Sequence, residues 1–342
     1  MRKRVLSGVR ATGRLHLGNY LGAVKGMLEI QDRGEHETFF MVVDLHTLTT
    51  PYDKDTLKES IRNIIIDYLS AGLDPEKSAI FIQSMVPEHL ELAYYFSTVT
   101  TVAKMQHLPT FKDKVKQYPE NVTMALLNYP VLMASDILIY KAGLVPVGID
   151  QEPHLEVARE IARRMNQDYG TDFPQPQRFG TKGEYVPSLS GEGKMSKSVE
   201  GSYINLTDSL EEIKSALARV TTDSGVGQVR KVEGKKEYFY ENEDGKISEG
   251  VGALMKFVEL FQGIEKRKEY EVQYESGGVK YSILKEELAN AIFDEIEPIQ
   301  KKRAELEANP DYVAQVIVEG AEKARMVASE TVREVREKMG LV

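Results

Sequence analysis

A glycine-bearing segment near the start of the chain reads Gly8-Val9-Arg10-Ala11-Thr12-Gly13-Arg14-Leu15-His16-Leu17-Gly18-Asn19. It follows a short apolar stretch, Val5-Leu6-Ser7, and precedes a helix-like pattern that extends to about residue 33. Glycines let a backbone approach a ligand closely, and a helix N-terminus attracts phosphate. The segment therefore predicts a phosphate-binding turn between a strand and a helix. Glycines that only shape a tight turn are the alternative interpretation.

The first half of the chain alternates strand-like and helix-like patterns. Apolar runs at 39–43, 79–82 and 144–147 indicate buried parallel strands, and apolar residues at helical spacing indicate helices over 54–71 and 153–166. Strands that alternate with helices form a parallel sheet covered on both faces. We therefore expect a doubly wound parallel α/β sheet, with ligands at the carboxyl ends of its strands.

The second half has a mainly helical pattern. Asp208-Ser209-Leu210-Glu211 has the capping-box signature that opens a helix. The highly charged run from Lys231 to Ser248 indicates a loop or a short hairpin insertion. We expect an α/β domain over residues 1–205 and a helical domain over 206–342, whose last helix can pack back onto the first domain.

Composition excludes several kinds of site. The 342 residues contain no cysteine, which excludes disulfides, zinc–thiolate sites, iron–sulfur clusters and a cysteine nucleophile. No apolar run approaches the roughly 20 residues that span a bilayer. No apolar signal-peptide core follows the basic start of the chain. The cytoplasm is therefore the expected compartment.

The net charge of −9 argues mildly against a large RNA partner, because such partners usually leave a basic signature. A local basic face can still coexist with an acidic remainder. The candidates for such a face are Lys104, Lys112, Lys114, Lys116, Arg159, Arg163 and Arg164. From composition alone, a solvated surface is the better interpretation of these residues.

A second signature is Lys194-Met195-Ser196-Lys197-Ser198, preceded by Gly191-Glu192-Gly193. Two ammonium groups on a hydroxyl-rich loop can stay close to a triphosphate while negative charge builds up on the departing pyrophosphate. Electrostatic stabilisation of this kind is typical of phosphoryl and nucleotidyl transfer. A solvated basic loop is the alternative interpretation.

Together the two signatures resemble the HIGH and KMSKS elements of class I aminoacyl-tRNA synthetases. His16-Leu17-Gly18-Asn19 corresponds to HIGH, and the final Asn is typical of tryptophanyl enzymes. Those enzymes usually have Thr in the first place, so His16 departs from the subgroup and restores the general pattern. Lys194 to Ser198 matches KMSKS at every position and follows the α/β half, as in the family.

The resemblance narrows to the bacterial-type tryptophanyl-tRNA synthetases over nearly the whole chain. The stretches that carry it are Asn128 to Leu138, Val145 to Gln151, His154-Leu155-Glu156, Thr221 to Ser224 and Gly320 to Ala324. The run from Lys231 to Ser248 is the least similar part. The resemblance implies a Rossmann-like catalytic domain with both ATP signatures over 1–205, and a helical domain for tRNA and anticodon binding over 206–342.

Substrate roles follow from the resemblance residue by residue. Asp136 corresponds to the carboxylate that accepts the indole N–H of tryptophan, and the apolar run before it indicates a pocket wall. A carboxylate there needs a donor, and phenylalanine would leave it unpaired. The other residues implied in tryptophan binding are Tyr129, Met133, His46, Gln151 and Val147. Core packing is the alternative for Tyr129, Met133 and Val147, and a structural role is the alternative for His46.

ATP roles are implied for both signatures and for the turn at 148–150. In that ribose-binding turn Ile149 replaces the usual Glu, and near the start Arg10 and Ala11 replace the usual Gln and Pro. The catalytic residues implied are Lys112, Lys194 and Lys197. The ATP-binding residues implied are Arg10, Ala11, Thr12, His16, Gly18, Asn19, Gly148, Ile149, Asp150, Val186, Lys194, Met195, Ser196, Lys197 and Ser198.

The resemblance implies an enzyme of protein biosynthesis that uses ATP with Mg²⁺ to join L-tryptophan to tRNA(Trp). It also implies a cytoplasmic homodimer. No metal ligand among the side chains and no membrane or DNA partner is expected. A partner surface is also indicated by an apolar run, for which core packing is the alternative. That run comprises Tyr94, Tyr95, Phe96, Val99, Val102 and Met105.

Two other functions are compatible with the two signatures. Tyrosyl-tRNA synthetase is the nearest, but the run from Met133 to Ile137 and Asn19 argue against it. A non-catalytic, synthetase-like regulator that binds RNA or nucleotide is the other. This alternative is disfavoured by the intact segments Lys194 to Ser198 and Gly18-Asn19. A protein that has lost the catalytic activity need not keep them.

Overall fold

The computed structural model describes residues 2–180, 185–191, 193–197, 199, 201–231 and 238–341. Ser198, which the sequence implied in ATP binding, lies outside these residues. Packing divides the chain into two compact units. The first comprises Met1–Arg14, Ala23–Glu184 and Glu305–Val342, and the second comprises Leu15–Gly22 and Tyr185–Ala304.

A five-stranded parallel sheet lies at the centre of the first unit. Its strands are β1 (Lys3–Val9), β2 (His36–Val42), β3 (Ser78–Ile82), β4 (Leu144–Pro146) and β5 (Gln177–Phe179), in the order β3-β2-β1-β4-β5. Every neighbouring pair is parallel. Residues 38–42 of β2 are all buried, as expected for a strand covered on both faces. The predicted doubly wound parallel sheet is confirmed.

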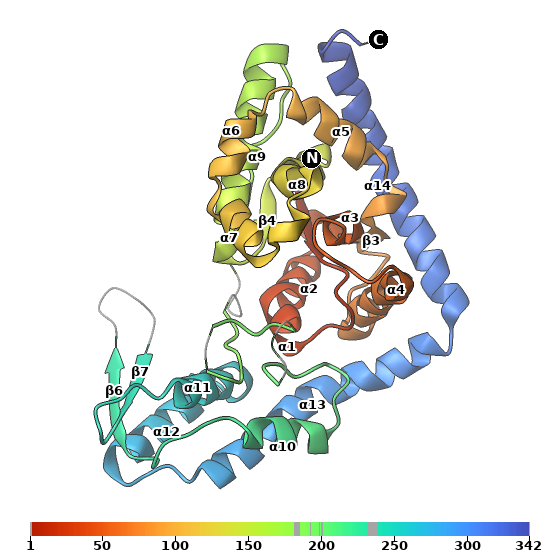
Figure 1. Cartoon of the computed structure of the whole chain (residues 1–342). Coiled ribbons are helices and arrows are strands. Elements are labelled where there is room, and N and C mark those ends of the chain that lie inside the picture. The colour runs from red at the N-terminus through yellow and green to blue at the C-terminus, as the bar shows by residue number, and fades with distance from the viewer. Residues whose placement is uncertain are drawn as a thin grey trace. The chain divides into compact units, whose positions relative to one another are not determined.

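Helices surround this sheet (Figure 1). They are α2 (Lys25–Arg33), α3 (Asp44–Thr47), α4 (Lys54–Ala71), α5 (Glu88–Ser97), α6 (Val102–His107), α7 (Pro109–Gln117), α8 (Met124–Ile139), α9 (Glu152–Tyr169) and α14 (Pro310–Lys338), with 3-10 turns η2 (Gln83–Met85), η3 (Pro119–Asn121) and η4 (Ile149–Gln151). The helices predicted over 54–71 and 153–166 correspond to α4 and α9. The Asp53 side chain caps α4 by accepting the N–H of Asp55, and Gly72 ends the helix with a positive φ of 112°.

Helix α14 runs along the edge strand β3 and beside α5 (Figure 1). At Gly320 the two backbones approach so closely that a Cβ atom would lie 1.8 Å from the carbonyl oxygen of Ile80. Ala321, Ala324 and Ala328 continue the line of small buried residues on this face of α14. Small side chains at these positions therefore let the helix lie against the sheet edge.

The second unit is mainly helical. It contains α1 (Leu17–Asn19), α10 (Leu210–Ala218), α11 (Glu249–Gln262), α12 (Ile264–Ser276) and most of α13 (Tyr281–Glu307), and the π-helical turn η1 (Tyr20–Val24) begins in it. Strands β6 (Gly227–Lys231) and β7 (Tyr238–Asn242) pair antiparallel on either side of residues 232–237. The capping box of α10 joins Ser209 and Glu212, one residue later than the expected Asp208 and Glu211.

The division of the chain into two packing units does not coincide with the single boundary expected at residue 205. Residues 15–22 belong to the mainly helical unit, and residues 305–342 belong to the unit that contains the sheet. Binding of tRNA by residues 206–342 stays a prediction. Within the described ranges, none of the helices has the length and apolar character needed to cross a membrane.

Candidate functional site

Asp136 lies buried in α8, with only 2% of its surface exposed. Its Oδ1 accepts a hydrogen bond from Gln83 Nε2 at 2.7 Å and lies 2.6 Å from His89 Nδ1. Its Oδ2 lies 2.8 Å from His46 Nε2. Burial alone would raise the pKa of Asp136, but the hydrogen bonds from His46 and His89 outweigh it and lower the pKa to about 2. The carboxylate is therefore ionised at neutral pH.

The three donors to Asp136 follow the carboxyl ends of two neighbouring strands. His46 lies in α3 just after β2, Gln83 begins η2 directly after β3, and His89 lies in the first turn of α5. Gln83 Oε1 accepts the N–H of Leu45 at 3.1 Å, which directs its amide nitrogen to the carboxylate. This is the sheet edge at which parallel α/β folds bind ligands.

These contacts overturn one expectation from the sequence. A buried carboxylate was expected to need a donor from the substrate, but three protein side chains already donate to Asp136. The burial of Asp136 is therefore satisfied without a ligand. A role in substrate recognition rests instead on its place at the ligand-binding edge of the sheet and on the second lone pair of Oδ2.

Sequence reasoning missed Gln83 and His89, and also Tyr140, whose hydroxyl lies 2.7 Å from His89 Nε2. Gln83 had a usable signal, because it is the first polar residue after the buried apolar run 79–82. His89 and Tyr140 had none, since neither interrupts a helical pattern in a way that distinguishes it from a core residue.

Tyr129, His46 and Gln151, three residues implied in tryptophan binding, lie in one group of contacts. The Tyr129 hydroxyl lies 2.8 Å from His154 Nε2, and His154 Nδ1 lies 3.0 Å from Gln151 Oε1. The rings of Tyr129 and His46 meet edge to face at 6.3 Å. Burial and the nearby His46 lower the pKa of His154 to about 4.

Met133 and Val147 are half-buried and pack against the hydrophobic core of the first unit. This packing agrees with their alternative role as core residues, although each also has an accessible part. Both remain candidates for an apolar pocket wall, since a wall residue must contact the core on one side and the ligand on the other.

Arg10 follows β1 and is half-buried. Its Nη2 donates to Thr50 Oγ1 at 2.9 Å, and its Nε is buried without a partner among the described residues. Burial lowers the pKa of Arg10, while the nearby Tyr118 and Tyr129 oppose that change. A half-buried cation with an unused donor suits an anionic ligand.

The residues beside Arg10 differ in accessibility. The buried Ala11 donates its N–H to Thr47 Oγ1 at 3.2 Å, whereas Thr12 is exposed. On α7, Lys112 is exposed. Lys114, two residues on, is half-buried, and burial followed by the nearby Arg10 lowers its pKa. Lys114 is therefore the lysine of α7 that lies near the Arg10 side chain.

The expected ribose-binding turn forms η4 and the residue before it. Gly148 is its N-cap, and Ile149 and Asp150 are exposed. Gln151 Nε2 donates to Asp150 Oδ2 at 2.7 Å. The turn therefore links the Asp150 carboxylate to the contacts around Tyr129 through Gln151 and His154.

In the second unit the two signature elements touch each other. The N–H of Gly18 donates to Met195 Sδ at 3.2 Å. A Cβ atom on Gly18 would lie 2.8 Å from His16 Cε1 and 3.2 Å from Met195 Cβ, so the contact needs glycine. The adjoining backbone is paired as well, because Leu17 N–H donates to the carbonyl of Ile204 at 2.9 Å.

The loop that carries the second signature turns its apolar residue inward. Met195 is buried, its N–H donates to the carbonyl of the buried Val186 at 2.9 Å, and Lys194 is exposed. Ser196 and Lys197 are half-buried. Met195 thus anchors the loop between its two lysines.

His16 is neutral at physiological pH, and Asn19 supports it locally. Burial, then Lys197 and Lys194, lower the pKa of His16 to about 4. The N–H of His16 donates to Asn19 Oδ1 at 3.4 Å, which closes the first turn of the helix. The positive charges of Lys197 and Lys194 thus contribute to the lowered pKa of His16.

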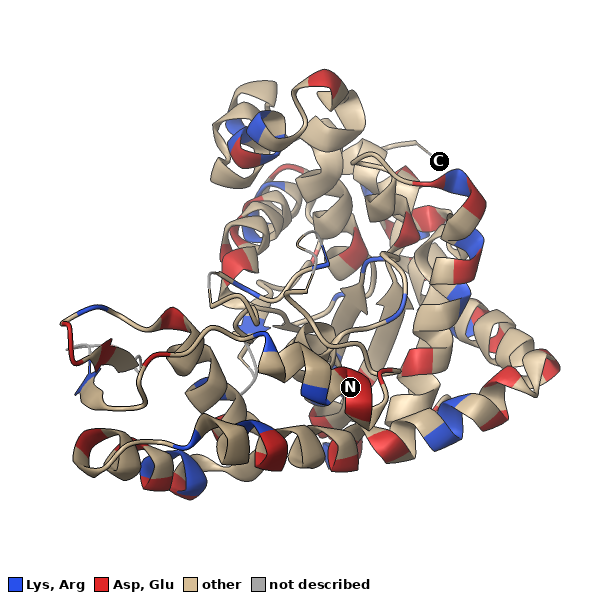
Figure 2. Ribbon diagram, turned by 60° about the horizontal axis from the view of Figure 1, so that its bottom comes forward, with Lys and Arg blue, Asp and Glu red and all other residues tan. Residues whose placement is uncertain are grey.

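The candidate basic residues of α9, together with Lys104 of α6, pair with neighbouring carboxylates. Arg159 pairs with Glu152 and Glu156, Arg163 pairs with Glu156, and Arg164 and Lys104 pair with Glu160. Figure 2 shows acidic and basic residues interspersed along the helices. These ion pairs favour the interpretation as a solvated surface for Arg159, Arg163, Arg164 and Lys104.

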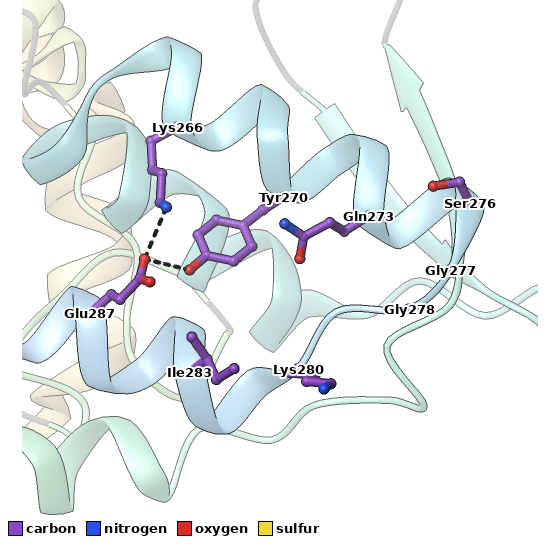
Figure 3. A pocket seen from close by; sticks show the side chains of 9 residues that line it. All are labelled: Lys266, Tyr270, Gln273, Ser276, Gly277, Gly278, Lys280, Ile283 and Glu287. Atoms are coloured by element: carbon purple, nitrogen blue, oxygen red, sulfur yellow. Dashed lines mark hydrogen bonds and ion pairs between the residues drawn. The ribbon is translucent and has the colours of Figure 1, made fainter.

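A separate cavity lies between α12 and the start of α13 (Figure 3). It offers about 370 Å³ to water-sized molecules. Glu287 accepts a hydrogen bond from the Tyr270 hydroxyl at 2.8 Å and pairs with Lys266 at 3.0 Å. No residue that the sequence implied in substrate binding lines this cavity.

The family assignment agrees with this architecture. The sequence model of the tRNA synthetases class I (W and Y) matches residues 1–296. The chain belongs to this family of class I tRNA synthetases.

Relatives within the family give a finer comparison. The tryptophan–tRNA ligase of Fusobacterium nucleatum subsp. nucleatum is 41% identical over 99% of this chain and 98% of its own length. That of Porphyromonas gingivalis is 38% identical over 98% of both chains. The crystal structure of tryptophanyl-tRNA synthetase from Campylobacter jejuni, complexed with ADP and tryptophan, has a TM-score of 0.80 and 31% identity, covering 98% of this chain and 99% of that one.

Proposed function

We propose that this chain is a tryptophan–tRNA ligase, which activates L-tryptophan with ATP and transfers it to tRNA(Trp). The observation that carries the activation chemistry is the contact between Gly18 and Met195, which joins the two ATP signatures. The choice of amino acid rests on the tryptophan-specific relatives and on the buried, ionised Asp136.

In the first step the tryptophan carboxylate attacks the α-phosphorus of ATP. The bond between the α-phosphorus and the oxygen that bridges to the β-phosphate breaks, and pyrophosphate leaves with the electron pair. The product is tryptophanyl-adenylate. No side chain becomes covalently attached, so catalysis consists of positioning and of charge stabilisation.

Lys194 and Lys197 are the groups that meet the charge on the departing pyrophosphate. Met195 holds their loop against Gly18, and the short paired backbone around Leu17 fixes the first signature beside it. The N–H of Gly18 donates to Met195 Sδ and that of Asn19 donates to the His16 carbonyl, so in the second unit the positive charge for the phosphates comes from the two lysines. Arg10, with Lys112 or Lys114, supplies positive charge in the first unit.

Asp136 is the group that recognises the indole ring. Among the described residues, Oδ1 accepts from Gln83 and His89, whereas Oδ2 accepts from His46 alone. A carboxylate oxygen has room for two hydrogen bonds. Oδ2 can therefore accept the indole N–H, while Tyr129 and Gln151 contact the rest of the amino acid.

ATP would bring its own Mg²⁺. Among the residues that the structure describes, no group of three or more His, Asp or Glu side chains is placed to hold a metal ion.

In the second step a hydroxyl at the 3′ end of tRNA(Trp) attacks the carbonyl carbon of the adenylate, and AMP leaves. Binding of the tRNA is assigned to residues 206–342, and the reaction takes place in the cytoplasm.

The assembly is a homodimer, which Tyr94 and Val102 support, because they are 71% and 58% exposed. Phe96 and Met105, from the same apolar run, are buried in the core.

Amino-acid-dependent exchange of pyrophosphate into ATP, measured with all twenty amino acids, tests this function. We expect exchange with tryptophan and strong preference over tyrosine and phenylalanine. Fastest exchange with tyrosine would identify the chain as a tyrosyl enzyme. No exchange with any amino acid would favour a non-catalytic regulator.

A further inference from the structure

A chain of buried polar groups extends from Asp136 away from the substrate side. His89 lies with Nδ1 2.6 Å from Asp136 Oδ1 and with Nε2 2.7 Å from the Tyr140 hydroxyl. The side chains of His89 and Tyr140 are fully buried. The Tyr140 ring stacks on Phe39 at 4.5 Å and meets Phe81 edge to face at 5.9 Å. The packing of Phe39 and Phe81 against the Tyr140 ring restricts the orientation of the Tyr140 hydroxyl.

The direction of these hydrogen bonds follows from the chemistry of the groups. An ionised carboxylate only accepts, so His89 Nδ1 must carry a proton. Burial, then Asp136 and Glu88, raise the pKa of Tyr140, so its hydroxyl keeps its proton. Among the described residues, His89 Nε2 is the acceptor within reach of the Tyr140 hydroxyl, and donation of the proton to it assigns His89 the tautomer with its proton on Nδ1.

The opposite tautomer of His89 would change Asp136. With its proton on Nε2, His89 would point a lone pair at Oδ1, and the repulsion between the two acceptors would favour the protonated form of Asp136. A protonated Asp136 can itself donate, so it no longer favours a substrate that brings an N–H. The Tyr140 hydroxyl prevents this outcome because it occupies His89 Nε2 as a donor.

We propose that His89 and Tyr140 are positioning residues for amino-acid specificity, which keep Asp136 ionised, fix the orientation of its carboxylate and leave only Oδ2 to a donor on the substrate side chain. The proposal rests on the proposed function, in which Asp136 recognises the indole N–H. Gln83 completes the arrangement, because its amide occupies the remaining position on Oδ1.

Titratable groups face this hydrogen-bonded chain from three helices. Asp136 faces His46 from α3 and His89 from α5. Tyr140 faces Asp136 and Glu88, and Glu88 in turn accepts from Ser329 of α14 at 2.7 Å and lies 3.5 Å from Arg325. A change confined to the Tyr140 hydroxyl removes none of these charges, so its effect on the pH profile comes from the lost hydrogen bond.

The test uses a pair of substrates that differ only at the indole nitrogen. In 3-benzothienyl-alanine a sulfur atom replaces the N–H of tryptophan. The ratio of kcat/KM for tryptophan to that for this analogue, measured by pyrophosphate exchange from pH 6 to pH 9, therefore reports recognition of the N–H. The variant is Tyr140→Phe in the full-length protein.

Tyr68→Phe is the matched control. Tyr68 is also fully buried, but its hydroxyl donates to the backbone carbonyl of Met41 at 3.2 Å and not to the chain that reaches Asp136. We expect Tyr140→Phe to lower the tryptophan-to-analogue ratio about five- to tenfold, with the loss greatest at low pH, because one hydrogen bond to a charged network is removed. Tyr68→Phe should lower the melting temperature without changing the ratio.

A second variant keeps the proposal testable if the hydroxyl alone is dispensable. In His89→Asn the side-chain nitrogen can still donate to Asp136 where Nδ1 does, whereas His89→Leu cannot. We expect Asn to retain more of the ratio than Leu. Ratios equal to wild type in Tyr140→Phe and in both His89 variants would overturn the proposal. A wild-type protein that does not prefer tryptophan over the analogue would instead overturn the proposed role of Asp136.

Discussion

The backbone N–H of Gly18 donates to the sulfur of Met195 at 3.2 Å, which joins two segments separated by most of the sheet-containing half of the sequence. The contact accounts for the apolar residue between the lysines of the second signature. Buried against Gly18, Met195 holds the backbone in place while Lys194 is exposed. In the proposed function, the placement of Lys194 and Lys197 at the ATP phosphates thus depends on Met195, a residue that carries no charge.

Gly18→Ala tests this contact. The new methyl group would lie 2.8 Å from the His16 ring and 3.2 Å from Met195 Cβ, so one side must move. We expect adenylate formation to slow by about 1–3 kcal/mol in activation free energy, as is typical of overpacking. Gly143→Ala is the control, because a Cβ there meets nothing within 4 Å and Gly143, like Gly18, does not have a positive φ. Equal rates of exchange in the two variants would contradict a role for the contact.

Lys197→Ala should lower the rate of pyrophosphate exchange far more than it weakens tryptophan binding. A lysine that meets charge developed in the transition state affects kcat and leaves ground-state binding nearly unchanged. Because the chain contains no Trp, bound tryptophan can be followed by its own fluorescence. Lys214→Ala, on α10, is the surface control. Comparable losses in rate and in affinity would indicate a structural role for Lys197.

Asp136→Asn keeps the size of the side chain but removes the charge. We expect kcat/KM for tryptophan to fall by roughly 1–3 kcal/mol, because the hydrogen bond to the indole loses its charge assistance. Phenylalanine, which has no ring donor, should be affected less, so the selectivity should shrink. Unchanged selectivity combined with a large drop in melting temperature would show that Asp136 serves stability alone.

Acid should destabilise the protein through two buried histidines. The pKa of His16 and that of His154 are both lowered from 6.5 to about 4. Between these values the unfolded chain binds protons that the folded chain does not, so the free energy of unfolding falls as the pH falls from 6.5 to 4. We expect His154→Gln to flatten the melting temperature over this range relative to wild type. His107→Gln, at an exposed position, is the control, and parallel curves for both variants would refute the assignment.

Light scattering at micromolar concentration should give the mass of a dimer. Tyr94→Asp should shift the protein towards monomer, because it places a charge in the proposed apolar contact. Tyr312→Asp, which alters an exposed tyrosine of α14, should leave the dimer intact. A wild-type monomer would exclude the proposed assembly.

Local pattern predicted the sheet better than the site. The runs 39–43 and 79–82 are continuous and apolar, so β2 and β3 were visible in the sequence. Strand β5 has only three residues, all partly accessible, and no pattern marks it. The neutralised charges of α9 were visible in principle, because Glu156 and Arg159 are three residues apart and Glu160 and Arg164 four apart.

The surroundings of Asp136 were beyond prediction for a different reason. Its donors lie 90, 53 and 47 residues away along the chain. Periodicity compares neighbours within a helix or strand, whereas these contacts depend on how loops from separate strands meet at one edge of the sheet. The resemblance to known synthetases singled out Asp136 and His46 but not the groups that hold them.

The packing of Gly320 against Ile80 has a consequence for the order of events on the ribosome. Strand β3 leaves the ribosome early, but the helix that covers its outer edge is made only after residues 206–304. Until then the strand presents unpaired backbone groups on which strands of other nascent chains can add. The outer edge of β3 therefore stays uncovered until α14 has been made. Once α14 has been made, Gly320 lets this helix pack directly against β3 and cover its edge.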